Sequence, residues 1–198
     1  MFFERIANKM PTPAAHTLIS TTIAIIYLSK DYIIAHKKFI LGFIIAISIL
    51  PDIDVAWDLF IRTPPIHHTF SHSIFTPIFL SLGYVVYTIL RKHKINTKLL
   101  FLFCLLYYFH LLADFFAYDL KPPYGLMLFW PFSNAYYISS QPFFLPVSKA
   151  TVLDLIRKEN FYALASETIL LILPFLLVIA IRWRKELYSH FSKIKHSH

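Results

Sequence analysis

The sequence is poor in cysteine, glycine and charge, and each shortage excludes a class of protein. Its 198 residues contain one cysteine, Cys104, which excludes a disulfide scaffold. Three glycines exclude a collagen-like repeat. Charged residues make up 15% of the chain, against about 25% in soluble domains, and this composition excludes disorder and coiled coil. The length fits one domain, which we place over residues 1–198.

What the sequence has in abundance is apolar side chains, which form 57% of it and favour a membrane protein. Five apolar stretches stand out, at residues 17–29, 39–50, 74–90, 99–118 and 161–181. A membrane span needs about 20 residues and at least about 17, so the last three are long enough and the first two are short. None alternates as a barrel strand does. We therefore predict an all-α fold, a multipass membrane helical bundle of about four to five hydrophobic helices with a polar site at one end.

The net charge of +8 is unevenly distributed along the chain. Lys and Arg near span ends favour the cytoplasmic side. If the five stretches alternate and the C-terminus lies inside, 12 basic residues fall on the inner side, five of them in a basic cytoplasmic tail at residues 182–198. The basic residues form no continuous stripe, so no nucleic-acid partner is expected. The predicted location is the cytoplasmic (inner) membrane, with the lipid bilayer as partner and the oligomeric state left open.

Histidine and acidic residues sort to the opposite, outer side of this topology. Five of the ten histidines lie in inner segments. The other five, together with four acidic residues, lie at or near outer helix ends: His16, His67, His68, His72, His110, Asp52, Asp54, Asp114 and Glu167. Histidine played no part in choosing the topology, so this sorting supports it. Ionisable groups in an apolar span are costly and indicate function.

Most of these residues lie in four short segments of the sequence, called pieces below. They are His16 after a Pro-Thr-Pro turn, the Leu-Pro-Asp-Ile-Asp run at residues 50–54, the His-His-Thr-Phe-Ser-His-Ser run at residues 67–73, and His110 with Asp114. The i, i+4 spacing of the last pair places imidazole and carboxylate on one helix face, about 5–6 Å apart at Cβ.

Imidazoles and carboxylates together are ligands for Zn²⁺, and also for Mn²⁺ or Fe²⁺. A structural zinc site would normally use cysteine, so we expect an open site that activates water for hydrolysis, with one or two ions. The predicted ligands are His16, Asp52, Asp54, His67, His72, His110 and Asp114. We assign catalytic roles to Asp54 and His67, with Asp54 as general base or as support to a histidine. Substrate-side or supporting candidates are His68, Ser73, Trp130 and Glu167.

Each piece also has a purely structural interpretation. Asp52 can cap the turn after Pro51, His67 and His68 can be solvated loop residues, and His110 with Asp114 can be a self-satisfied buried pair. Glu167 can pair with Arg157 or Lys158, an interpretation that we prefer to metal binding. Trp130 and its aromatic neighbours can be an interfacial belt. Taken together, however, these interpretations leave the one-sided clustering unexplained.

In this order, the pieces resemble the YdjM-like family of predicted inner-membrane metal-dependent hydrolases, over roughly residues 16–133. The family pattern is an early His, Leu-Pro-Asp-x-Asp, His-Arg-Gly-x-Thr-His-Ser, His-x-x-x-Asp, then Gly before Trp-Pro-Phe. This chain departs from it in the third piece, where His68, Thr69 and Ser71 stand for Arg, Gly and Thr. More remotely, the order of ligands is similar to that of zinc-dependent phospholipases C, which is an analogy.

The leading hypothesis is a membrane-bound metal-dependent hydrolase that acts on a lipid or another membrane-associated ester or phosphoester. The alternatives are a metal or proton transporter, and a non-catalytic membrane assembly protein with a structural metal site. Against transport, the polar groups crowd one end and leave the inner half of each span without ionisable residues.

Overall fold

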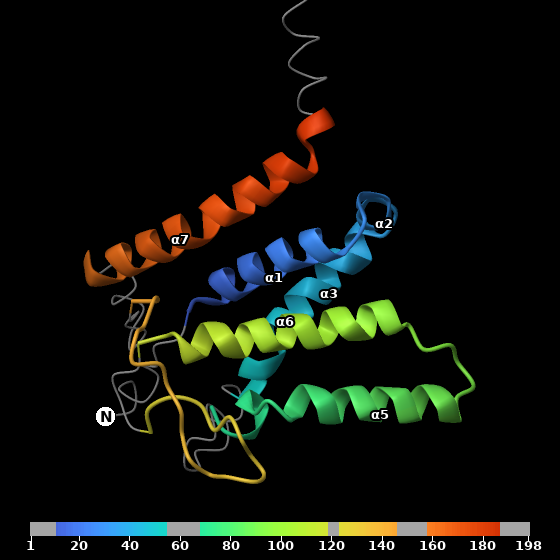
Figure 1. Ribbon diagram of the computed structural model, residues 1–198, viewed down its shortest axis with the longest axis horizontal. Coiled ribbons are helices and arrows are strands. Elements are labelled where there is room, and N and C mark those ends of the chain that lie inside the picture. The colour runs from blue at the N-terminus through green and yellow to red at the C-terminus, as the bar shows by residue number, and fades with distance from the viewer. Residues whose placement is uncertain (1–10, 55–67, 119–122, 146–157, 187–198) are drawn as a thin grey trace, which may run out of the picture.

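The computed structural model describes residues 11–54, 68–118, 123–145 and 158–186, and these are largely helical (Figure 1). The elements in chain order are α1 (Pro13–Tyr27), α2 (Lys30–Ala35), α3 (Lys37–Ile49), η2 (Leu50–Asp52), η3 (Phe70–His72), α5 (Thr76–Leu90), α6 (Thr97–Phe115) and α7 (Lys158–Arg182). Across the described ranges, β pairing is limited to two isolated bridges. The predicted all-α class is confirmed for this part of the chain.

Helix starts follow from capping residues in the sequence. The Thr12 side chain accepts a hydrogen bond from the Ala15 backbone N–H at 3.2 Å, and Pro13 takes the first position of α1. Asn96 caps α6 in the same way through the Leu99 N–H at 3.1 Å. These caps fix where α1 and α6, two of the helices around the polar site, begin.

Helix α1 lies at the centre of the bundle (Figure 1). It packs against α3, α6 and α7, and α5 packs against α6 on the far side. The apolar core lies between α1, α3 and α6, and its buried members are Ala24, Leu28, Ile40, Ile44, Ile47, Leu102 and Leu106. The core therefore joins the three helices that lead to the polar site.

Helix α7 is fastened to α1 at both ends. Near the start of α1, the Glu167 carboxylate accepts hydrogen bonds from the Thr12 hydroxyl at 2.9 Å and from the Thr12 N–H at 3.3 Å. At the other end of α1, the Arg182 guanidinium donates to the Leu28 carbonyl. Lys30 there also pairs with Glu186. Between these contacts α7 is largely exposed, with Leu177 60% accessible.

Two helices are long and apolar enough to cross a membrane, Thr97–Phe115 with mean hydropathy 1.6 and Phe161–Arg182 with mean hydropathy 2.5. Helices α1 and α5 are apolar but have 15 residues each. That length gives about 22 Å, against a hydrocarbon core of about 30 Å. Of the four to five predicted hydrophobic helices, the described ranges thus show two that are long enough to be candidate spans.

The stretch at residues 74–90, which we expected to be a full span, forms a shorter helix because α5 begins only at Thr76. The preceding residues 70–72 form the 3-10 turn η3, and Pro77 occupies the first turn of α5, where a missing N–H costs no hydrogen bond.

The two ends of the bundle differ in chemistry. Figure 1 shows the end of α1, the start of α3, the end of α5, the start of α6 and the end of α7 on one side. Basic residues mark these helix ends, including Lys30, Lys37, Arg91, Lys98 and Arg182. The 3-10 turns and the non-helical segment at residues 123–145 lie at the opposite end, where the polar cluster is found.

Candidate metal centre

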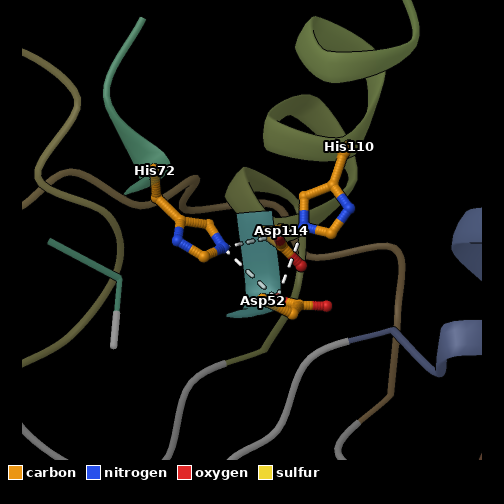
Figure 2. Close-up of side chains that lie close together, drawn as sticks. All are labelled: Asp52, His72, His110 and Asp114. Carbon is orange, nitrogen blue, oxygen red and sulfur yellow. Dashed lines mark ion pairs between the residues drawn. The ribbon is translucent and has the colours of Figure 1, made fainter. Parts of the chain in front are cut away.

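Four side chains from three separate segments meet at this opposite end (Figure 2). They are Asp52 from η2, His72 from η3, and His110 and Asp114 from α6. One ligand atom from each lies within 4.8 Å of all the others. Segments that are distant in sequence therefore converge on one point.

Local sequence explains how each segment arrives there. Pro51 cannot continue the hydrogen bonding of α3, and the chain turns into η2, which carries Asp52. His110 and Asp114 lie one turn apart on α6, as their spacing predicts. Because α6 ends at Phe115, Asp114 occupies its last turn.

The four imidazole–carboxylate distances across the cluster lie between 3.0 and 3.5 Å. His110 Nε2 lies 3.0 Å from Asp114 Oδ2 and 3.5 Å from Asp52 Oδ1. His72 Nε2 lies 3.4 Å from each of the same two oxygens. With metal–ligand bonds of about 2.0–2.2 Å, neighbouring ligand atoms of one ion lie about 3–4 Å apart. The two imidazoles and two carboxylates are thus spaced for one small divalent ion.

The Nδ1 atoms of His72 and His110, which do not face the cluster, have contacts of their own. His110 Nδ1 lies 3.0 Å from the Ser48 carbonyl oxygen, an acceptor that requires a proton on Nδ1. His72 Nδ1 lies 2.9 Å from Ser71 Oγ and 3.6 Å from Asp54 Oδ2. Such contacts orient metal-binding imidazoles and direct Nε2 towards the ion.

Several polar atoms of the site lack a hydrogen bond although they are buried. Within the described ranges these are both ring nitrogens of His16, Asp52 Oδ1, His110 Nε2 and both carboxylate oxygens of Asp114. A buried polar group without a partner costs about 1–3 kcal/mol. A divalent cation would satisfy the converging atoms together, so the donor set fits a metal of the Zn²⁺, Mn²⁺ or Fe²⁺ type.

The neighbouring imidazoles keep the carboxylate of Asp52 ionised. The side chains of His72, His110 and Asp114 are inaccessible, whereas 15% of the Asp52 side chain is exposed. Burial would raise the pKa of Asp52, but the imidazoles of His110 and His72 outweigh it and lower that pKa well below its usual range. Asp52 is therefore an anion at neutral pH and forms the open side of the cluster.

His72 has the opposite shift. Burial would lower its pKa, but the three carboxylates around it outweigh burial and hold the pKa well above the usual value. In the metal-free protein the imidazolium is therefore favoured at neutral pH, and a metal ion must displace its proton.

His16 lies beside the four residues rather than among them. Its Nε2 is 3.3 Å from Asp114 Oδ1, whereas His72 and His110 face the other oxygen of that carboxylate, Oδ2. The side chain is buried in the first turns of α1. One oxygen of the Asp114 carboxylate therefore faces His16, and the other faces His72 and His110.

Two other predicted residues of the second and third pieces, Asp54 and His68, lie next to the four converging residues rather than among them. Asp54 is 2% exposed and lies behind His72, on the Nδ1 side, where the Ser71 hydroxyl donates to it. His68 adopts a φ of +65°. Its ring packs edge-on against the ring of His72, with the ring centroids 4.8 Å apart. His67, predicted as a ligand and catalytic residue, lies outside the described residues.

The remaining candidates contact the surroundings of the site. Ser73 is buried and donates to the Trp130 carbonyl at 2.6 Å. The Trp130 ring lies 6.1 Å from that of Phe70. Glu167 binds the Thr12 cap of α1, the helix that carries His16, whereas Arg157, one of its predicted partners, lies outside the described residues.

Sequence reasoning did not name Ser48 or Tyr107, and it noted Ser71 only as a departure from the family pattern. Ser48 acts through its carbonyl, which no side-chain pattern reports. The Tyr107 hydroxyl donates to the Ser71 carbonyl at 2.6 Å and holds the turn that bears His72. A signal was available for Tyr107, since it lies one turn before His110 on the same face of α6.

The sequence model of the YdjM inner membrane protein family matches residues 10–187. The chain belongs to this family. No curated protein and no solved structure gives a significant match.

The YdjM match extends beyond the residues that suggested it. We expected a resemblance over roughly 16–133, whereas the family covers the cluster, the non-helical segment after α6 and the whole of α7. An inner membrane family agrees with the apolar helices and with a lipid bilayer as partner. No comparison supports the remoter likeness to zinc phospholipases C, which remains an analogy.

Proposed function

We propose that this YdjM family member is a membrane-bound metal-dependent hydrolase that cleaves a lipid or another membrane-associated ester or phosphoester. The observation that carries the proposal is the convergence of two imidazole nitrogens and two carboxylate oxygens at one end of an apolar bundle. A divalent ion held by such a set lowers the pKa of bound water to about 7 and supplies a hydroxide nucleophile.

Each residue of the candidate metal centre has its own proposed role. Asp52, His72, His110 and Asp114 hold the ion, and the partial exposure of Asp52 gives a substrate access on that side. Asp54 supports His72 through Nδ1, a role that suits its position on the side of the ring away from the other ligand atoms. The roles assigned to His67, as ligand and as catalytic residue, stay predictions.

A second ion is supported by the position of His16. Asp114 turns one oxygen to His16 and the other to His72 and His110, as a carboxylate that bridges two metals does. Two metals about 3.5–4 Å apart are common in phosphoester cleavage. This arrangement favours a phosphoester among the possible substrates.

Charge supports a multipass topology with the site near the outer face of the cytoplasmic membrane. The helix ends opposite the site carry the basic residues, which prefer the cytoplasmic side. In this topology the shorter helices α1, α3 and α5 accompany the two longer spans.

The test is metal analysis of the purified protein, followed by turnover of a panel of phospholipids and neutral ester lipids with added Zn²⁺ or Mn²⁺. Asp52→Asn and His110→Ala should lose both bound metal and turnover, while His93→Ala, at an exposed position remote from the cluster, should keep both. Metal-dependent turnover that is unchanged in the two site variants would refute the proposal. Metal uptake into proteoliposomes without turnover would favour a transporter instead.

A further inference from the structure

The non-helical segment at residues 123–145, called here the aromatic platform, contains no Asp, Glu, Lys or Arg. Eight of its 23 residues are aromatic, and large apolar side chains on it are open to the surroundings. Phe132 is 76% exposed, Phe143 62% and Tyr124 51%. A charge-free, aromatic and exposed surface of this kind is unlike the usual surface of a soluble domain.

The platform is hydrogen-bonded to the end of a candidate membrane span. Helix α6 is one of the two candidate spans and ends at Phe115. Phe116 then accepts a hydrogen bond from the Phe143 N–H at 2.9 Å, and the Phe115 carbonyl accepts one from the Ser139 N–H at 3.0 Å. The platform is therefore joined to the protein at the level where this candidate span ends.

The platform is also bonded to the segment that carries His72. The Ile74 N–H donates to the Leu128 carbonyl at 3.0 Å, and the Met127 N–H donates to the His68 carbonyl at 2.9 Å. Ser73 adds its hydrogen bond to Trp130. The platform and the segment that carries His72 therefore lie at the same end of the bundle (Figure 1).

We propose that the aromatic platform is a docking surface for the lipid headgroup layer of the leaflet on the site side. Its non-helical backbone is unsuited to the hydrocarbon core, where unpaired N–H and C=O groups cost several kcal/mol each. Its exposed aromatic rings are equally unsuited to water, whereas Trp and Tyr favour the membrane interface. Attachment to the end of α6, a candidate span, selects lipid as the occupant, and the bonds to the His72 segment place the polar cluster at headgroup depth.

Fluorescence quenching tests this depth without any reference to catalysis. Trp57, Trp130 and Trp183 are first replaced by Phe, and a single Trp is then introduced as Phe132→Trp. The protein is reconstituted in phosphatidylcholine vesicles brominated either near the headgroup or near the chain end, and aqueous iodide serves as the third quencher. Leu82→Trp, on the outer face of α5, and Lys94→Trp, in the loop after α5, are the matched controls.

We expect the emission of Phe132→Trp to be lost most strongly with bromine near the headgroup. Leu82→Trp should respond most to bromine near the chain end, and Lys94→Trp to iodide alone. Phe143→Trp is a second platform probe, used if the first variant does not fold. If platform probes respond to iodide alone, or to no quencher because protein covers them, the proposal is overturned.

Discussion

The imidazole of His16 stacks on that of His110, with ring centroids 3.8 Å apart and planes inclined by 18°. The two rings approach Asp114 from the same side of the bundle, yet each faces a different carboxylate oxygen. The stack therefore fixes the relation between the first turns of α1 and the last turns of α6.

If Asp114 bridges two ions, removing the nitrogens of His16 should remove one of them. His16→Phe keeps a stacked ring and should lower the metal content of the purified protein from two ions per chain to one. Elemental analysis after equilibration with Zn²⁺ or Mn²⁺ measures this, with His93→Phe as the control. An unchanged metal content would show that His16 is not a ligand.

The Ser71 hydroxyl, placed between Asp54 and His72 Nδ1, should tune the affinity for the ion. Loss of a group that orients a metal-binding imidazole costs about 10–100-fold in affinity. Ser71→Ala should show that loss in a competition titration with a chelating dye. Ser71→Thr keeps the hydroxyl and should retain the affinity; equal weakening of both variants would contradict this role.

Metal binding should strengthen as the pH rises through neutrality. The raised pKa of His72 leaves it protonated in the metal-free protein, and the ion must displace that proton. The same raised pKa stabilises the metal-free fold below the unfolded pKa of about 6.5, and that stabilisation is lost as the pH rises through the folded-state pKa. Titrations between pH 5.5 and 8.5 that show a pH-independent affinity would refute the argument.

Gly125 should be irreplaceable in the aromatic platform. It has a φ of +90°, and a Cβ there would lie 2.3 Å from the Tyr137 carbonyl oxygen. Gly125→Ala should therefore destabilise the platform by about 1–3 kcal/mol.

Gly83→Ala is the matched control because a Cβ at that position of α5 meets nothing within 4 Å. It should be neutral or stabilising by about 0.5–1 kcal/mol, since alanine favours helix. Thermal unfolding in detergent compares the two variants, and equal melting temperatures would contradict the prediction.

Glu167 should stabilise the start of α1. Glu167→Ala removes the acceptor for the Thr12 hydroxyl and N–H and should cost about 1–3 kcal/mol. Thr168→Ala, which removes a hydroxyl bonded to Leu164 within the same helix, is the neighbouring control. A melting temperature lowered no more by Glu167→Ala than by the control would exclude this anchoring role.

The sequence alone named all four residues that converge in the structure. His110 and Asp114 were predictable because helical spacing determines which side chains share a face. Asp52 and His72 were named because polar residues in an apolar chain are costly and rare. The pattern could not distinguish Asp52 from Asp54, since the two flank Ile53 and only the geometry of η2 decides which carboxylate faces the ligand atoms.

Contacts made by backbone groups could not be predicted from the sequence. The Ser48 carbonyl that holds His110 is a main-chain group, and any residue type could supply it. The length of the helix expected at residues 74–90 was overestimated for a related reason. Hydropathy ignores hydrogen bonding, whereas η3 and Pro77 delay the start of α5 until Thr76.

The two attachments of α7 to α1 have an electrostatic meaning. A helix carries about half a positive charge at its N-terminus and half a negative charge at its C-terminus. Helix α7 sets a carboxylate, Glu167, against the first of these and a guanidinium, Arg182, against the second. The two ionic groups of α7 thus neutralise the dipole of α1. Although α1 is too short to cross a bilayer by itself, each of its ends faces a side chain of opposite charge.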